Sequence, residues 1–394
     1  MRTLPLDGQS LLERVEALVP ALAAEAPEAE RLRRPTDAAI RMLEDAGLFR
    51  MMVPHAYGGL QLDLDTFLEV GLALGEADTS LAWVASFCVE HNWMLCQFPE
   101  RFQRELYTGK SHILAPGVIA PTGAAVREAG GYRLTGRWQW GTGVMHASWV
   151  IVGALADLQP GEPPSPERMR FFAVPIADVK VEDTWYVDGM VGTGSNDIVI
   201  DGVLVPEERS VSIAAMMEGR APGSRLHAAP LYHTPMLPIL VLASATPVIG
   251  QTRAIVRGFG ERLANHVRLS AAMTRQSEKP ALQMRLGKAA IEARQAELAL
   301  RDIVDEVCAV RDRATPVQRS RWVATGAHAV QQARRVLADV SEGSGASAHF
   351  LQHALQRAVR DANVASCHIV FDFDTHRQVY GKLLLGLDAT GAMY

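Results

Sequence analysis

The order of three residue patterns along the chain is the feature that most constrains its fold. Apolar residues recur at helical spacing through residues 9–115, as in LLERVEALVPALAAEA and AAIRMLEDAGLFRMMV. From about 116 to 210 the sequence changes to glycine, proline and short alternating runs such as GGYRLTGRWQW and SWVIVGAL, which are typical of β-strands joined by turns. Helical spacing returns after about residue 225. The long helical segments expected there are Leu237–Leu263, Ala281–Arg311, Val317–Val340 and Ala354–Phe371.

These patterns predict a mainly α protein with a central β domain. We expect an N-terminal helical domain over 1–115, a small β barrel or sandwich over 116–215 and a C-terminal helical bundle over 216–394. Within the first domain, the segment from DLDTFLEV to MLCQF has apolar and small residues on more than one face. It is therefore expected to form a pair of buried helices, which places His91 deep in the protein.

The composition argues against several kinds of partner. The 394 residues carry a formal net charge of −5, which gives no electrostatic reason to bind nucleic acid or an anionic membrane. The four cysteines are scattered, without metal-ligand spacing, so neither a disulfide framework nor a metal site is expected. No signal peptide is visible, and prolines interrupt the uncharged stretch 226–252, which we interpret as a loop leading into a buried helix. We expect a cytoplasmic protein.

Two segments of the predicted β domain carry candidate binding residues. GRWQWGTGVMHASWV contains Trp138 and Trp140, followed by Thr142 and Gly143; VDGMVGTGSNDIVIDGVLVP contains Gly192, Gly194 and Ser195. Aromatic faces beside a hydroxyl suit a flat apolar ring with a polar edge, and glycines allow close approach of a backbone to a ligand. The residues alone leave a structural alternative open in each case: core tryptophans with a turn threonine, and a hairpin turn.

Together these features resemble the acyl-CoA dehydrogenase fold over essentially the whole chain. The resemblance is carried by MLEDAGLFRMMVPHAYGGL, by GRWQW with the following GTG, by GTGS…VP and by a C-terminal Arg-Asp helix. It implies that the hydroxyl of Thr142 bonds the flavin edge near N5, with Trp138 and Trp140 as wall or stacking residues. It also implies that the Gly-rich segment approaches the flavin chain, where Ser195 donates to a phosphate.

The C-terminal helix departs from the dehydrogenase pattern. Acyl-CoA dehydrogenases commonly place a catalytic Glu about two turns after the Arg-Asp pair, but here Arg360-Asp361 is followed by ANVASCHIVFDFD, without Glu. Glu292 or Glu297 remain possible bases on another helix, although neither sits in a recognisable motif. An FAD-dependent acyl-CoA dehydrogenase therefore stays the alternative function, and a non-catalytic flavin-fold binding module a third possibility.

With His91, Thr142 and His368, the sequence is more similar to the two-component flavin-dependent monooxygenases of this fold, such as p-hydroxyphenylacetate hydroxylase and dibenzothiophene monooxygenase. That resemblance implies a reduced flavin, FMN or possibly FAD, supplied by a separate NAD(P)H:flavin reductase. It also implies reaction with O2 through a flavin C4a-hydroperoxide and a homotetramer. An imidazole that titrates near neutrality suits proton transfer in such a site.

Two departures from the monooxygenase pattern bear on ligands. Ala115-Pro116-Gly117 stands where the p-hydroxyphenylacetate enzymes have a substrate-positioning Ser, which favours a bulkier aromatic or polycyclic substrate. His233 stands where an Arg is expected near the flavin phosphate, which leaves FMN against FAD open. The sequence does not identify the substrate or distinguish C-, N- and S-oxygenation.

Overall fold

The structure, a computed structural model, describes residues 3–158, 161–265, 275–389 and 391. Five helices come first, and they confirm the helical pattern of the N-terminal third. Their bounds are α1 Leu6–Leu32, α2 Asp37–Asp45, α3 Leu64–Ala77, α4 Thr79–Leu95 and α5 Glu100–Tyr107. The expected pair of buried helices is α3 and α4. Every residue of α4 is buried, as expected of a helix that is apolar on more than one face.

A seven-stranded sheet follows, in the order β5-β6-β2-β1-β3-β4-β7. Its strands are β1 Gly117–Glu128, β2 Gly131–Gly141, β3 Trp149–Ala156, β4 Met169–Pro175, β5 Lys180–Glu182, β6 Asn196–Pro206 and β7 Ser210–Ser212. All neighbouring pairs are antiparallel except β1 and β3, which run parallel. The alternating runs GGYRLTGRWQW and SWVIVGAL lie in β2 and β3, as predicted. This part confirms the central β domain of the fold class.

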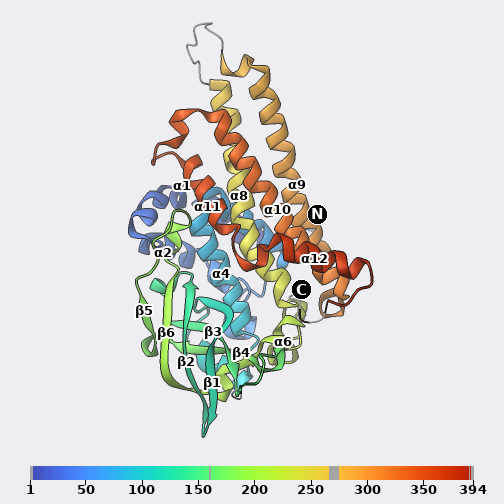
Figure 1. Ribbon diagram of the computed structural model, residues 1–394. Coiled ribbons are helices and arrows are strands. Elements are labelled where there is room, and N and C mark those ends of the chain that lie inside the picture. Colours follow the sequence, from blue (N-terminus) through green and yellow to red (C-terminus); the bar gives the residue numbers. More distant parts are fainter. Residues whose placement is uncertain (1–2, 159–160, 266–274, 390, 392–394) are drawn as a thin grey trace.

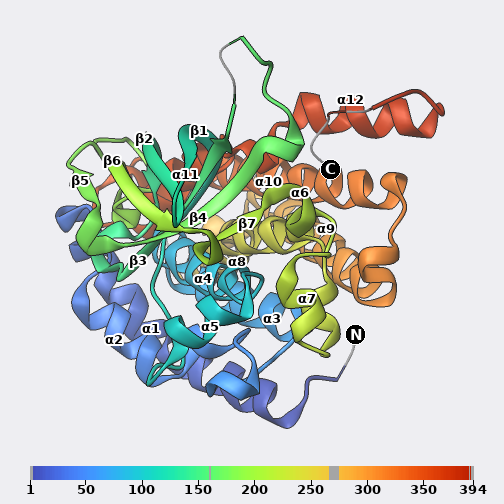
Figure 2. The same ribbon diagram turned by 90° about the horizontal axis from the view of Figure 1, so that it is seen from below.

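The elements that follow β7 are helices. The helices are α6 Ile213–Met217, α7 Pro222–Leu226, α8 Met236–Asn265, α9 Pro280–Val310, α10 Pro316–Ser344, α11 Ala354–Ala365 and α12 Phe373–Leu384. The long helices α8, α9 and α10 run side by side away from the sheet, and α8 also packs on α3 and α4 (Figures 1 and 2). By length and composition α8 is apolar enough to cross a membrane, but 83% of its apolar window is buried inside the protein, as in a core helix.

One expected helix is shorter than its pattern predicts. The apolar spacing predicts a helix from Ala354 to Phe371, whereas α11 ends at Ala365 and a separate helix, α12, begins at Phe373. The backbone of His368 is extended, with φ −61° and ψ 142°, and its side chain accepts a hydrogen bond from the N–H of Val370. This cap starts a new turn, so His368 lies at a break between helices.

Candidate active site

The candidate site is built on one face of α4. Trp83, Phe87 and His91 are spaced by four residues, which aligns their side chains along the helix. The ring centroids of Trp83 and Phe87 are 4.9 Å apart, and those of Phe87 and His91 are 5.5 Å apart. These three rings form a continuous aromatic row inside the N-terminal helical domain.

His368 reaches this row from the other end of the sequence. Its ring lies edge-on to Trp83 at 5.5 Å and to Phe87 at 5.9 Å between centroids. Phe87 therefore separates His368 from His91, and both imidazoles line one patch of aromatic surface. The structure thus brings together two of the histidines that the sequence singled out.

The two imidazoles carry their protons on different nitrogens. Nδ1 of His91 lies 2.6 Å from the carbonyl oxygen of Ala115; a carbonyl only accepts, so Nδ1 donates and Nε2 keeps a lone pair. In His368 the N–H of Val370 donates to Nδ1 at 3.4 Å, so Nε2 carries the proton. His91 therefore offers an acceptor and His368 a donor.

Both imidazoles are neutral at pH 7. Burial lowers the pKa of His91 to about 4, against the opposing effect of its hydrogen bond to Ala115. Burial likewise lowers the pKa of His368 to about 4. The expectation of an imidazole that titrates near neutrality is therefore wrong, because burial among aromatic rings disfavours the charged form.

Thr142 lies in a strained turn that packs on the same helix. Trp140 has φ 66°, a rare conformation for a bulky residue, and its side chain is 62% exposed. The N–H of Thr142 donates to the Trp140 carbonyl at 2.8 Å. Gly143 has φ 72°, and a Cβ added there would lie 2.9 Å from Cγ1 of Val84. The turn therefore packs on α4 at Val84.

Three hydroxyls meet behind this turn. Oγ1 of Thr142 lies 3.1 Å from Oγ of Ser195, which lies 2.7 Å from Oγ1 of Thr193. The N–H of Gly143 also donates to the carbonyl of Thr193 at 3.0 Å. Two segments of the β domain, separated by fifty residues of sequence, are joined here, and Thr142, Gly143 and Ser195 fall into one cluster.

One predicted site residue, Trp138, lies away from the aromatic row and the hydroxyl cluster. Trp138 is fully buried in the core of the sheet, where its Nε1 donates to the Gly153 carbonyl at 2.7 Å. Its ring faces are covered by protein, so its predicted role as a flavin wall is wrong. In a regular strand, residues two positions apart share one face of the sheet, so Trp138 and Trp140 would lie on the same side. The irregular backbone at Trp140 interrupts this alternation, so Trp138 is buried whereas Trp140 is exposed.

Gly192 and Gly194 do allow close approach, but to other parts of the chain. A Cβ at Gly192 would meet Ser80 at 3.2 Å, and one at Gly194 would meet the backbone of Arg33 at 2.9 Å. Their predicted approach to a cofactor is therefore replaced by packing on α4 and on the end of α1. His233 ends the turn Pro230–His233, where its carbonyl packs against Gly219 rather than against the hydroxyl cluster.

Asn92, which the sequence reasoning did not select, fixes the partner of His91. Its Nδ2 donates to the carbonyl of Ile113 at 2.8 Å, and its Oδ1 accepts from the N–H of Ile113 at 2.9 Å. This pairing holds the segment whose Ala115 carbonyl sets the tautomer of His91. The sequence signal that could have identified Asn92 is its polar side chain within VEHNWML, a segment of a helix that is otherwise mainly apolar.

Asp361 joins the hydroxyl cluster to the C-terminal bundle and was also missed as a site residue. Its carboxylate accepts from the N–H of Met190 at 2.6 Å and from Oγ of Ser80 at 3.1 Å. Burial, followed by the charge of Asp78, raises the pKa of Asp361 to about 7. The Arg-Asp pair therefore serves to hold the segment that presents Thr193 and Ser195.

The candidate dehydrogenase bases are engaged elsewhere. Glu297 forms ion pairs with Arg294 and Arg301, and Glu292 pairs with Lys288, all on α9. Neither contacts the aromatic row. The structure therefore offers no support for either residue as the base of the alternative function.

Glu90, next to His91, is a buried carboxyl without a hydrogen-bond partner among the described residues. Burial raises its pKa well above the usual range. The stability contributed by such a group is full at low pH and is lost as pH rises through the folded-state pKa, at about 1.4 kcal/mol per unit of pKa difference. We expect Glu90→Gln to unfold like the parent at pH 4, below the unfolded-state pKa of Glu, and to be more stable at pH 8. Urea unfolding at both pH values tests this, and an equal difference at both would contradict it.

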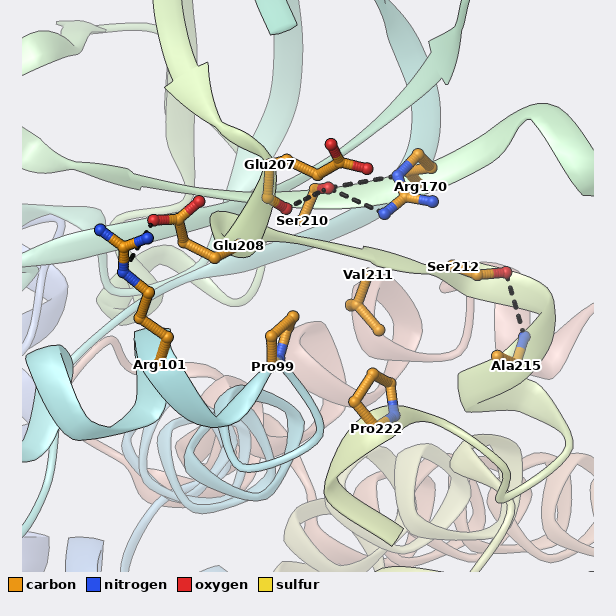
Figure 3. Close-up of a pocket in the computed structure, with 10 residues that line it drawn as sticks. All are labelled: Pro99, Arg101, Arg170, Glu207, Glu208, Ser210, Val211, Ser212, Ala215 and Pro222. Atoms are coloured by element: carbon orange, nitrogen blue, oxygen red, sulfur yellow. Dashed lines mark hydrogen bonds and ion pairs between the residues drawn. The ribbon is translucent and has the colours of Figure 1, made fainter. Parts of the chain in front are cut away.

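A surface groove lies at the opposite end of the sheet, beside β4 and β7 (Figure 3). Four of its polar residues form two pairs, Arg101 with Glu208 and Arg170 with Ser210. None of the residues that the sequence selected lines it. The aromatic row with the hydroxyl cluster is therefore the better candidate site.

Comparison with known proteins identifies the family of the chain. The description "Acyl-CoA dehydrogenase, N-terminal domain" matches residues 9–110, and "Acyl-CoA dehydrogenase, C-terminal domain" matches residues 242–373. A pigment production hydroxylase of a Rhodococcus species is 37% identical, over 96% of this chain and 96% of its own. The flavin-dependent monooxygenase oxygenase subunit HsaA of Rhodococcus jostii is 31% identical, over 97% of this chain and all of its own.

A solved structure extends the similarity to three dimensions. XiaF from a Streptomyces species, in complex with FADH2 and glycerol, superposes with a TM-score of 0.89 at 28% identity and covers 98% of each chain. Sequence relatives and the solved structure both match across nearly the full length, through the helices and the sheet that form the candidate site. The chain belongs to the flavin-dependent monooxygenases built on the acyl-CoA dehydrogenase fold.

Proposed function

We propose that this protein is the oxygenase component of a two-component system, which uses reduced flavin and O2 to oxygenate an aromatic or polycyclic substrate at the aromatic row. The observation that carries the proposal is the contact of both His91 and His368 with Phe87 of α4, where the two imidazoles present opposite hydrogen-bonding groups. The turn that bears Thr142 packs on the same helix at Val84. Relatives named as flavin-dependent monooxygenases support the reaction class.

The residues present fit a flavin. The exposed Trp140 offers an aromatic face, and Thr142 places a hydroxyl at the surface end of a buried polar chain. These suit a flat apolar ring with a polar edge. When bound in reduced form, the flavin supplies the electrons that activate O2. The protein's part is to orient the ring, to exclude water with Trp83 and Phe87, and to place protons at defined atoms.

The tautomers suggest how the two histidines divide the work. Nε2–H of His368 donates toward developing negative charge as O2 is reduced. Nε2 of His91 accepts the proton of a substrate hydroxyl, or orients that hydroxyl. Because both rings are neutral at pH 7, neither function needs a change of charge before reaction.

Ala115-Pro116-Gly117 bears on the substrate. A Cβ at Gly117 would lie 2.7 Å from Nε2 of His91, so glycine keeps the accepting nitrogen uncovered. The same segment offers no side-chain hydroxyl to a phenol. These residues favour a bulkier aromatic or polycyclic substrate that is held by shape and by His91.

We further propose that a separate NAD(P)H:flavin reductase supplies the reduced flavin, FMN or FAD, and that the protein is cytoplasmic. Its relative HsaA is named as an oxygenase subunit, which supports a partner reductase. No disulfide joins the cysteines of the described residues, as is usual in a reducing compartment. Because reduced flavin acts as a co-substrate, the purified protein should be nearly colourless.

The function is tested by mixing the protein with anaerobically reduced FMN and then adding 18O-labelled O2 and a panel of phenols and polycyclic aromatics. Incorporation of one labelled oxygen atom into an aromatic product is the expected result. Oxidation of an acyl-CoA by tightly bound FAD, without labelled product, would favour the dehydrogenase and overturn the proposal.

Thr142→Ala is expected to weaken flavin orientation and to raise the fraction of reduced flavin that yields hydrogen peroxide instead of product. Removing one member of a buried hydrogen-bonded chain costs about 1–3 kcal/mol. Product and peroxide per flavin oxidised are the measurement, with Thr142→Ser as the hydroxyl-retaining control. Parent-like yields from the alanine variant would remove Thr142 from the site.

The expected assembly is a homotetramer, and exposed apolar residues support a second copy as the partner. Met284, Ile291 and Leu298 recur every seven residues along α9 and are 74%, 61% and 47% exposed. This spacing gives one apolar stripe on the helix surface. Light scattering at micromolar concentration should give a tetramer, and Ile291→Lys should lower its mass. A monodisperse parent monomer would contradict the proposal.

A further inference from the structure

The hydroxyls behind Thr142 form a chain with a fixed end. Oγ1 of Thr193 lies 2.8 Å from the carbonyl oxygen of Met190, which also accepts from Nε1 of Trp185 at 3.1 Å. The N–H of Met190 is held by the carboxylate of Asp361 at 2.6 Å. A backbone carbonyl can only accept hydrogen bonds, so the direction of donation is fixed at this end of the hydroxyl chain.

This fixed end sets the direction of donation at each link as far as Thr142. Each hydroxyl has one proton to donate. Thr193 donates its proton to the Met190 carbonyl, so the 2.7 Å contact is a donation from Ser195 to Thr193. The proton of Ser195 is then used, and the 3.1 Å contact is a donation from Thr142 to Ser195. Thr142 is left with lone pairs alone for any ligand.

Burial protects this arrangement from water. Thr193 and Ser195 are almost fully buried, whereas Thr142 is the more accessible end. Water could otherwise donate or accept at any link and erase the direction. Inside a low-dielectric environment each bond also strengthens the next, which favours one orientation of the whole chain.

We propose that this chain makes Thr193 a specificity-determining residue that favours reduced over oxidised flavin. The inference rests on the proposed function and on the placement of the Thr142 hydroxyl near flavin N5, which the family resemblance implies. In reduced flavin N5 bears a hydrogen and donates, whereas in oxidised flavin N5 has only a lone pair and accepts. A Thr142 hydroxyl that can only accept forms a hydrogen bond with N5–H of reduced flavin. The same hydroxyl places a lone pair against the N5 lone pair of oxidised flavin, which is unfavourable.

The test measures the affinities of reduced and oxidised FMN for the same protein under anaerobic conditions. Thr193→Val removes the hydroxyl that receives the proton of Ser195. Ser195 is then free to donate to Thr142, and Thr142 is free to donate to N5. The ratio of reduced to oxidised affinity should fall about 10-fold or more, as expected when oxidised flavin gains a hydrogen bond in place of an unfavourable contact.

Three variants serve as controls. Thr193→Ser keeps the hydroxyl and should keep the parent ratio. Thr252→Val makes the same change at a buried threonine of α8 that donates to the Val248 carbonyl, and should leave the ratio unchanged. Ser195→Ala breaks the chain one link nearer to the flavin and should lower the ratio as Thr193→Val does, which keeps the test available if the valine variant does not fold.

An unchanged affinity ratio in both Thr193→Val and Ser195→Ala would overturn the proposal while leaving the proposed function intact. Failure of the parent to bind either form of FMN or FAD would overturn both. If Thr193→Val lowers the affinity ratio and Thr193→Ser keeps the parent ratio, the direction of the hydroxyl chain is the cause, because serine retains the hydroxyl at position 193 and valine lacks it.

Discussion

The His368→Ala variant is expected to slow oxidation of reduced flavin by O2 by about 100-fold or more, even without substrate, because a fixed donor in a dry site stabilises developing negative charge. Nε2–H is the donor, since Nδ1 is occupied by the N–H of Val370. Trp83 and Phe87 exclude water from two sides of the ring, so solvent would replace the lost donor poorly. Stopped-flow flavin absorbance after mixing with O2 measures the rate.

His353→Ala provides a matched control for the structural part of this effect. His353 caps α11 by accepting from the N–H of Leu355, as His368 caps its own turn, but it lies away from the aromatic row. Its removal should lower stability modestly and leave flavin oxidation unchanged. Equal rates in the parent and in His368→Ala would remove His368 from the site.

His91→Ala should leave flavin oxidation nearly intact and lower the product formed per flavin oxidised by about 100-fold, with the difference released as hydrogen peroxide. The reason is the tautomer: the bond from Nδ1 to Ala115 leaves Nε2 as the acceptor for a substrate hydroxyl. The two variants therefore separate the O2 step from the substrate step. Product and peroxide yields in single-turnover experiments are the measurement.

His227→Ala is the control for loss of a buried imidazole. Burial lowers the pKa of His227 to about 4, as it does for His91, but Nε2 of His227 pairs with the side chain of Gln103. This control should keep parent yields. If His91→Ala alone behaves like the parent, His91 is a packed core histidine; if the His368 variant does so too, the site assignment is wrong.

Local sequence pattern was sufficient for the order of the three regions and for most of their elements, but it missed the break between α11 and α12. Helical spacing and strand alternation act over neighbouring residues, so α3, α4 and the main strands follow from them directly. Single residues were harder to interpret. Trp138 and Trp140 are two positions apart in one motif, yet Trp138 lies in the sheet core and Trp140 on the surface. The left-handed backbone of Trp140, where the pairing of β2 with β6 is irregular, has no signature in residue type.

The sequence by itself determined the fold class and the three side chains proposed for chemistry, because it contains family motifs and lacks the expected glutamate after Asp361. The tertiary structure decided which groups surround them and in which state. Thr193 and Ser195 reach Thr142 across fifty residues, and Ala115 and Val370 set the tautomers of the two histidines. Hydrogen-bond direction and burial depend on contacts between distant segments, and no local pattern encodes those contacts.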